Sequence, residues 1–461
     1  MTLFTLDHWR RGREIAVVGL ARSGAAATRL LRRLGFDVYA SDSGAGAELE
    51  ACAAELRVAG AVVELGRHDP ARIARAAGVV VSPGVPPEAP PLVAARAAGV
   101  EILSEVEIGL AALGARSRYV AITGTNGKTT TTALTAHVLR AIGLDAEACG
   151  NIGRPVCDVA LAATPPAWLV LEVSSFQLHD CPYIAPAVGV LTNLAPNHLD
   201  RYATLEEYYG DKARLFANAS ASSVWVTNGG DPAVQALVAG VPGTHQRFSV
   251  RQRAEAWFDR AGGQLRLNDD VVMPRAELQL LGDHNVENAL AATLVAAAVA
   301  RMAGQPAPPL GAIAEGLRSF RAIPHRVEPV RTVDGVRWIN DSKSTNVTST
   351  EVALRAVDGT VVLLLGGRHK GEPYTRLAPL LAGRCRGVVA FGEAASIVKA
   401  DLGALVPVVE AGSDFAQVMR EARRLAQPGD VVLLSPACSS YDMFEHFEHR
   451  GEVFRAMVNA L

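Results

Sequence analysis

The chain has 461 residues, a formal net charge of −2 and 49% hydrophobic residues, which is enough apolar material for several buried cores. The near-neutral charge gives no basis for binding nucleic acid or an anionic membrane surface. The six Cys form no CxxC pair, which indicates buried thiols in a reducing compartment, and no apolar run approaches the roughly 20 residues of a membrane span. We therefore expect a cytoplasmic protein.

The N-terminal region has the strand, turn, helix and strand pattern of a Rossmann-like domain. Residues 14–19 predict a buried strand, 25–34 a helix and 38–41 a second strand. Ala21 stands where the dinucleotide fingerprint requires its second glycine, so we do not expect a nicotinamide cofactor. A nucleotide at the strand ends remains compatible with the pattern, and a Pro/Gly turn at 82–87 follows a further apolar strand.

Residues 120–132 have the layout of a phosphate-binding loop, with an apolar strand, a Gly-rich turn and then a helix. The loop is the shorter form of the motif, because Ile122 occupies the place of the first glycine in the full pattern. Lys128 is expected to reach the β- and γ-phosphates of a nucleotide, and the Thr129 hydroxyl to bind Mg²⁺.

Polar side chains also follow two later strands of the same region. Glu172 ends the strand predicted at 168–173, beside the phosphate loop, where a Mg²⁺-binding carboxylate belongs. His198 follows the strand predicted at 187–192 in a crowded polar segment. Residues 204–219 predict a helix that carries Lys212.

Lysine is rare in this chain, since only five of the 45 basic residues are Lys. A surviving Lys is a candidate for chemistry that Arg cannot perform, such as losing a proton and reacting as an amine. Four of the five stand in distinctive local sequence, whereas Lys399 lies on an ordinary predicted helix. The five are Lys128, Lys212, Lys343, Lys370 and Lys399.

The second half of the chain is predicted to be β-rich over 225–281 and then to open an Ala-rich helix. Asn285 and Asn288 are three residues apart at the start of that helix, so they share a face and can contact one ligand. After residue 328, strands and helices alternate to the end of the chain. Polar loops follow three of these strands, and in an open parallel sheet such loops gather at one edge.

The ordered set of motifs resembles the Mur ligase family, and within it the glutamate-adding type. The motifs are GTNGKT, GNIG, LEVSSFQL, NHLDRY, GDHNVENA, PHR, NDSKSTN, GGRHK and SPACSSYDMFEHFEHRG, and the resemblance runs from about residue 15 to the C-terminus. It implies an α/β protein of three domains: a Rossmann-like UDP-binding domain at 1–117, a central mononucleotide-binding ATPase domain at 118–327 and a Rossmann-like amino-acid-binding domain at 328–461.

The resemblance also implies an activity. ATP would convert the carboxylate of UDP-N-acetylmuramoyl-L-alanine to an acyl phosphate, which the amine of glutamate would attack, in peptidoglycan precursor synthesis. The implied enzyme is a monomer that uses two Mg²⁺ ions, and its catalytic residues are Lys128, Glu172, His198 and Lys212. The metal ligands would be Thr129, Glu172, His198 and Lys212, the last as a carbamate.

The remaining residues implied by the resemblance divide among three ligands. ATP would be bound by Gly124, Thr125, Asn126, Gly127, Lys128, Thr129, Thr130, Asn285, Asn288, His325, Arg326 and Asp341. The UDP-substrate would be bound by Ser23, Asp42, Ser43, Gly84, Asn151 and His198. The incoming glutamate would be bound by Thr345, Lys370, Ser440 and Phe447.

Two departures from the family pattern are Gly44, where an Arg is common, and Asn197, where an Asp is expected. The sequence does not decide between D- and L-glutamate. A sister ligase or a folylpolyglutamate synthase would share much of the pattern. An ATP-driven switch is another alternative, but it leaves Lys212 and Lys370 without a role.

Overall fold

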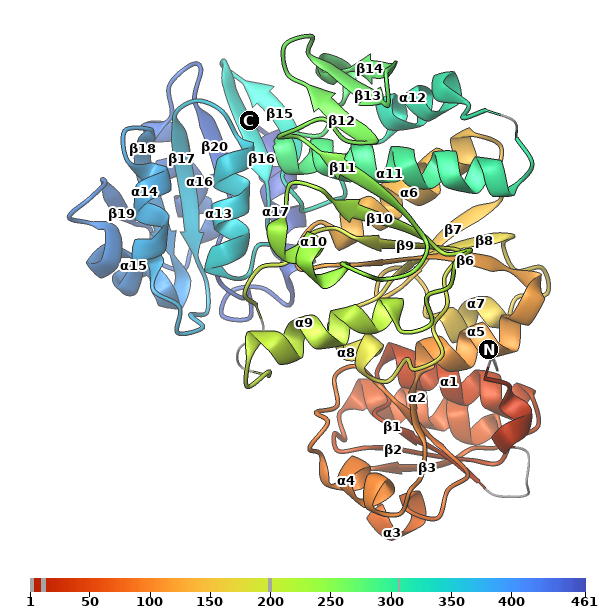
Figure 1. Cartoon of the computed structure of the whole chain (residues 1–461). Coiled ribbons are helices and arrows are strands. Elements are labelled where there is room, and N and C mark those ends of the chain that lie inside the picture. The colour runs from red at the N-terminus through yellow and green to blue at the C-terminus, as the bar shows by residue number, and fades with distance from the viewer. Residues whose placement is uncertain (1–3, 10–13, 198–200, 306) are drawn as a thin grey trace. The chain divides into compact units, whose positions relative to one another are not determined.

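The computed structural model describes residues 4–9, 14–197, 201–305 and 307–461. These form two compact units, which are described separately: Met1–Glu277 with Val286–Phe320, and Leu278–Asn285 with Arg321–Leu461. Within the described ranges the chain forms three α/β sheets, two in the first unit and one in the second (Figure 1). The predicted α/β class with three sheet domains is confirmed.

The N-terminal sheet has the strand order β3-β2-β1-β4-β5, and every pairing in it is parallel. Its apolar side chains alternate between two cores, so helices cover both faces (Figure 1). The strands are β1 Ile15–Val18, β2 Val38–Asp42, β3 Val62–Leu65, β4 Val79–Val81 and β5 Ile102–Ser104. The helices are α1 Arg22–Arg33, α2 Ala47–Val58, α3 Pro70–Ile73, α4 Pro90–Ala97 and α5 Glu105–Leu113.

The central sheet has the order β14-β13-β12-β11-β10-β9-β6-β8-β7, parallel from β12 to β7 and extended by two antiparallel strands. The strands are β6 Arg118–Thr123, β7 Ala146–Gly150, β8 Trp168–Glu172, β9 Val188–Leu191, β10 Val224–Asn228, β11 Thr244–Ser249, β12 Ala256–Asp259, β13 Gln264–Leu267 and β14 Asp270–Pro274. The helices are α6 Lys128–Ala141, α7 Val156–Ala160, α8 Ser175–His179, α9 Leu205–Ala213, α10 Pro232–Leu237, α11 Asp283–Met302 and α12 Leu310–Ser319. The prediction of a β-rich stretch over 225–281 is confirmed.

The C-terminal sheet has the order β15-β16-β20-β17-β18-β19, with helices on both faces (Figure 1). It is parallel except for β15, which pairs antiparallel with β16 at the edge and which the sequence reading missed. The strands are β15 Glu328–Val333, β16 Val336–Asn340, β17 Val361–Gly366, β18 Cys385–Phe391, β19 Val408–Glu410 and β20 Val431–Leu434. The helices are α13 Val347–Ala356, α14 Ala378–Leu381, α15 Ala395–Leu402, α16 Phe415–Leu425 and α17 Phe447–Asn459. No helix of the described residues is long and apolar enough to cross a membrane.

Candidate active site

The phosphate loop connects β6 to α6, as the sequence predicts. Gly124 has a φ of +145° and Gly127 a φ of +81°, which glycine adopts without strain. A Cβ on Gly124 would lie 2.0 Å from Thr192 Oγ1, so the close packing also excludes a side chain there. The loop therefore ends with the N-terminus of α6 behind it, an arrangement that favours a bound phosphate.

Lys128 and Lys212 meet on one carbonyl of this loop. Lys128 Nζ donates to Gly124 O at 3.1 Å and to Thr125 O at 2.8 Å. Lys212 Nζ donates to the same Gly124 O at 2.7 Å from the buried side of α9. The side chain of Lys212 is 1% exposed, and its Nζ lies 4.5 Å from the ring centroid of Tyr208, one helical turn earlier.

The environment of Lys212 removes the charge of its amine. Burial lowers its pKa, the nearby charge of Lys128 lowers it further, and the net result is a pKa of about 6 despite the opposing effect of Asp211. The amine is therefore mostly neutral at pH 7. A neutral amine is a nucleophile, whereas an arginine at this position would keep its charge.

Glu172 ends β8 beside the loop, since it pairs with Ile122 of β6. Asn151 Nδ2 donates to its Oε1 at 2.8 Å, and its buried Oε2 has no hydrogen-bond partner among the described residues. A buried carboxylate oxygen without a partner next to a phosphate loop fits a Mg²⁺ ligand. Thr129, also nearly buried, lies in the first turn of α6. His198, the remaining predicted metal ligand, lies outside the described residues.

Among the described residues, no group of three His, Cys, Asp or Glu side chains could hold a metal ion.

The predicted UDP-substrate residues line one cavity of about 540 Å³ at the carboxyl edge of the N-terminal sheet. Five of the six expected residues contribute to it: Ser23, Asp42, Ser43, Gly84 and Asn151. Both oxygens of Asp42 accept backbone N–H groups, from Leu20 at 2.6 Å and from Gly44 at 2.8 Å. Asp42 thus shapes the turn after β1 in the present structure. His68 and Gln177, which the sequence reading did not include, also line the cavity.

Asn288 lies against the phosphate loop, where its Oδ1 accepts from Thr131 Oγ1 at 2.9 Å and would contact a Cβ on Gly127. Asn285, on the first turn of the same helix, belongs to the second unit, and its amide donates to Leu281 O at 2.7 Å.

The second unit holds the other predicted ATP residues, His325, Arg326 and Asp341. Burial raises the pKa of Asp341 to about 6, although Ser344, Ser435 and the Val327 N–H donate to it. His325 is buried at a φ of +65°, its ring close to Asn340 Nδ2 at 3.1 Å, and burial lowers its pKa.

The predicted glutamate residues lie on loops that follow neighbouring strands of the C-terminal sheet. Thr345 follows β16, Lys370 follows β17 and Ser440 follows β20, and Phe447 begins α17. Backbone pairing of Arg368 with Ser439 joins the second and third loops, and Ser342 Oγ donates to Phe447 O at 2.8 Å to join the first loop to α17. Lys370 is exposed, so its amine is accessible.

Comparison with known proteins identifies the family. The chain matches the Mur ligase MurD-like N-terminal domain over residues 13–104, the Mur ligase middle domain over 122–296 and the Mur ligase glutamate ligase domain over 325–438. The chain belongs to the Mur ligase family. Mur ligases are ATP-dependent enzymes.

Curated relatives match this Mur ligase over nearly its whole length and theirs. The UDP-N-acetylmuramoylalanine–D-glutamate ligase of Salinibacter ruber is 42% identical, with 99% of this chain and all of that protein covered. The enzyme of the same name from Geobacter metallireducens is 42% identical over 98% of both chains. Among solved structures, the MurC ligase of Thermotoga maritima aligns at a TM-score of 0.59 and 19% identity over 97% of this chain and 99% of its own, which supports the fold.

The sequence reading missed one part of the phosphate-loop support in this Mur ligase. Asn193 accepts from Asn126 N at 2.9 Å and donates to Asn126 O at 3.0 Å, while Thr192 Oγ1 donates to the same carbonyl at 2.7 Å. These residues follow β9, the neighbour of β6, so they hold the loop in shape from the side. The available signal was a polar pair directly after an apolar strand.

Proposed function

We propose that this Mur ligase joins D-glutamate to UDP-N-acetylmuramoyl-L-alanine with ATP, through an acyl phosphate, and releases ADP and phosphate. The observation that carries the proposal is the pair of lysines on Gly124 O, one positioned for a nucleotide phosphate and the other a buried neutral amine. The named activity of the full-length relatives supports the choice of substrates.

Lys128 and the N–H groups of residues 124–130 would hold the ATP phosphates, and Lys128 would offset the charge that builds up as the substrate carboxylate attacks. The Lys212 amine would attack CO₂ and lose a proton to solvent, which gives a carbamate whose oxygens can bind a metal ion. Thr129, Glu172, the Lys212 carbamate and His198 would then hold two Mg²⁺ ions. When bound, Mg²⁺ neutralises phosphate charge and thereby lowers the cost of bringing two anions together.

The substrates would be positioned by the two sets of strand-end loops. The cavity at Ser23, Ser43, Gly84 and Asn151 would take the UDP-sugar, with its alanine carboxylate directed to the phosphate loop. The loops that carry Lys370 and Ser440 would hold glutamate, whose uncharged amine attacks the acyl phosphate carbonyl as phosphate leaves. Positioning of this kind provides much of the rate enhancement in such reactions.

The proposal includes the three-domain division at residues 117 and 327, a cytoplasmic location and a monomeric state. Light scattering on the purified protein would test the last of these, since a stable dimer would double the mass.

A phosphate-release assay tests the activity. We expect release that requires ATP, Mg²⁺, UDP-N-acetylmuramoyl-L-alanine and D-glutamate together, with L-glutamate, L-alanine and L-lysine as amino-acid controls. Release with another amino acid instead would indicate a sister ligase. Release that needs no amino acid and forms no amide product would refute the ligase proposal in favour of an ATP-driven switch.

A further inference from the structure

The turn at 82–87, which follows β4, forms part of the wall of the substrate cavity. Ser82 anchors its first end, since its N–H donates to Val18 O at 3.0 Å and its Oγ to Gly19 O at 2.9 Å. Three of its six residues are proline and have no backbone N–H, so the turn cannot be held by a regular hydrogen-bond ladder. Within the turn the Val85 N–H donates to Ser82 O at 3.0 Å, and Arg96 donates to Pro87 O at its end, which leaves the carbonyls of Pro83 and Val85 to be supported by another segment.

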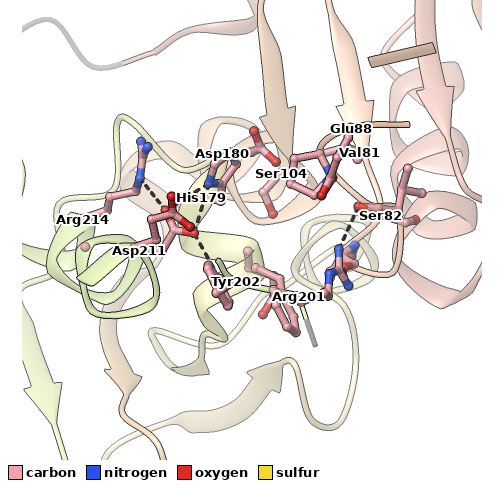
Figure 2. Close-up of a pocket in the computed structure, with 17 residues that line it drawn as sticks. Val81, Ser82, Glu88, Ser104, His179, Asp180, Arg201, Tyr202, Asp211 and Arg214 are labelled. Atoms are coloured by element: carbon pink, nitrogen blue, oxygen red, sulfur yellow. Dashed lines mark hydrogen bonds and ion pairs between the residues drawn. The ribbon is translucent and has the colours of Figure 1, made fainter. Parts of the chain in front are cut away.

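Arg201, from the central domain, provides that support. Its Nη1 donates to Pro83 O at 3.2 Å and its Nη2 to Val85 O at 3.0 Å, so one guanidinium holds two carbonyls of the turn. No other group of the described chain donates to these two carbonyls. Figure 2 shows Arg201 reaching toward Ser82 in a second cavity, of about 650 Å³, which shares Ser82, Pro83 and Val85 with the substrate cavity.

The guanidinium is itself held in place. Its central carbon lies 4.2 Å from the ring centroid of Phe176, and that ring stacks on Tyr202 with centroids 5.6 Å apart. Tyr202 OH donates to Asp211 Oδ2 at 3.0 Å, and Asp211 precedes Lys212 on α9 (Figure 2). A planar fork that stacks and donates twice is specific to arginine.

We propose that Arg201 is a positioning residue for the UDP-substrate, which holds the turn at 82–87 in the shape that binds it. The proposal rests on the proposed function, because it concerns the same substrate cavity. Arg201 acts through the turn and is not among the residues that line the substrate cavity, so it is expected to affect substrate affinity more than the chemical step.

Two substitutions and one control test this. Arg201→Met removes both donors but keeps the aliphatic stem, and Arg201→Lys keeps a charge but not the two-point geometry. Arg247→Met is the matched control, since Arg247 lies on β11 of the central sheet and pairs with Glu255 rather than with the turn or Asp211. All three proteins are first checked for an unchanged melting profile.

Calorimetry with UDP-N-acetylmuramoyl-L-alanine should give a Kd about tenfold higher for Arg201→Met, an intermediate Kd for Arg201→Lys and an unchanged Kd for Arg247→Met. In steady-state assays the KM for this substrate should rise while the KM for ATP and kcat at saturation stay close to those of the unmodified enzyme. The Val85 N–H, which donates to Ser82 O at 3.0 Å, should exchange with solvent faster in Arg201→Met.

An Arg201→Met protein that folds and binds the UDP-substrate as tightly as the unmodified enzyme would overturn the inference. So would equal losses in kcat and in ATP affinity, which indicate a general structural role. If Arg201→Met fails to fold, Arg201→Lys carries the same test. An unmodified enzyme that does not bind UDP-N-acetylmuramoyl-L-alanine would refute the proposed function instead.

Discussion

Replacement of Lys212 by arginine tests the central chemical idea, that this lysine reacts as an amine. A lysine with a pKa of about 6 is roughly 90% neutral at pH 7, whereas an unperturbed lysine near pKa 10.4 is only about 0.04% neutral. Burial thus raises the reactive fraction by about three orders of magnitude. Arginine keeps its charge and cannot form the carbamate, so we expect Lys212→Arg to lose about 99% or more of phosphate release.

The assay compares Lys212→Arg with Lys399→Arg in buffer that contains bicarbonate. Lys399 is the matched control, because its Nζ donates to a single carbonyl, Val408 O at 2.8 Å, in the C-terminal sheet. Carbon NMR with labelled bicarbonate should give a carbamate signal in the unmodified enzyme and in Lys399→Arg but not in Lys212→Arg. Near-normal turnover of a folded Lys212→Arg protein would refute the reasoning.

Three further predictions concern Glu172 and Asn193 beside the phosphate loop, and Glu105, which accepts from Cys157 N of the central domain. Glu172→Gln keeps the hydrogen bond from Asn151 but removes the carboxylate charge. Mg²⁺-dependent turnover should therefore fall by about 100-fold or more, while the melting temperature stays the same. An unchanged dependence of turnover on Mg²⁺ would contradict this. Asn193→Ala should raise the KM for ATP, because Asn193 holds both backbone groups of Asn126; Asn218→Ala is the control, since the half-buried Asn218 donates to Pro182 O and Ile184 O instead. Burial raises the pKa of Glu105 to about 7, so the folded state holds this proton more tightly than the unfolded state does. The protonated carboxyl therefore contributes to the free energy of unfolding at low pH, and this contribution is lost as the pH rises through 7. Glu105→Gln should therefore unfold at higher denaturant concentration than the unmodified protein at pH 8.5, a gain that disappears at pH 5; equal midpoints at both pH values would argue against a buried carboxyl.

The parts of the site with a local signal could be predicted from the sequence. The phosphate loop is one continuous segment in which apolar strand, glycines and helix follow each other, and its conformation depends mostly on that segment. The helix that carries Lys212 was also predictable, because Thr204 Oγ1 accepts from Glu207 N at 3.2 Å, the expected cap. The position of Tyr208 on the same face as Lys212 was predictable too, because helical spacing brings residues four apart together.

Other features depend on contacts between distant segments, and these were missed. Asn193 supports Asn126 only because β9 pairs with β6, a neighbour relation that no local pattern encodes. The edge strand β15, Glu328–Val333, contains a proline and alternates exposed with half-buried residues, so it resembles a polar linker until β16 pairs with it.

The charge of Lys128 also affects the protonation of Lys212, since both amines donate to Gly124 O. Two ammonium groups that share one carbonyl repel, and the energy is lowest when only one of them is charged. The buried amine of Lys212 is the one that loses its proton, because burial lowers its pKa and the charge of Lys128 lowers it further. The proposed carbamate on Lys212 would replace this neutral amine by an anion, which would attract the Lys128 ammonium instead of leaving it without a counter-charge. The neutral amine is the form that the proposed carbamate requires, because a protonated lysine has no lone pair with which to attack CO₂.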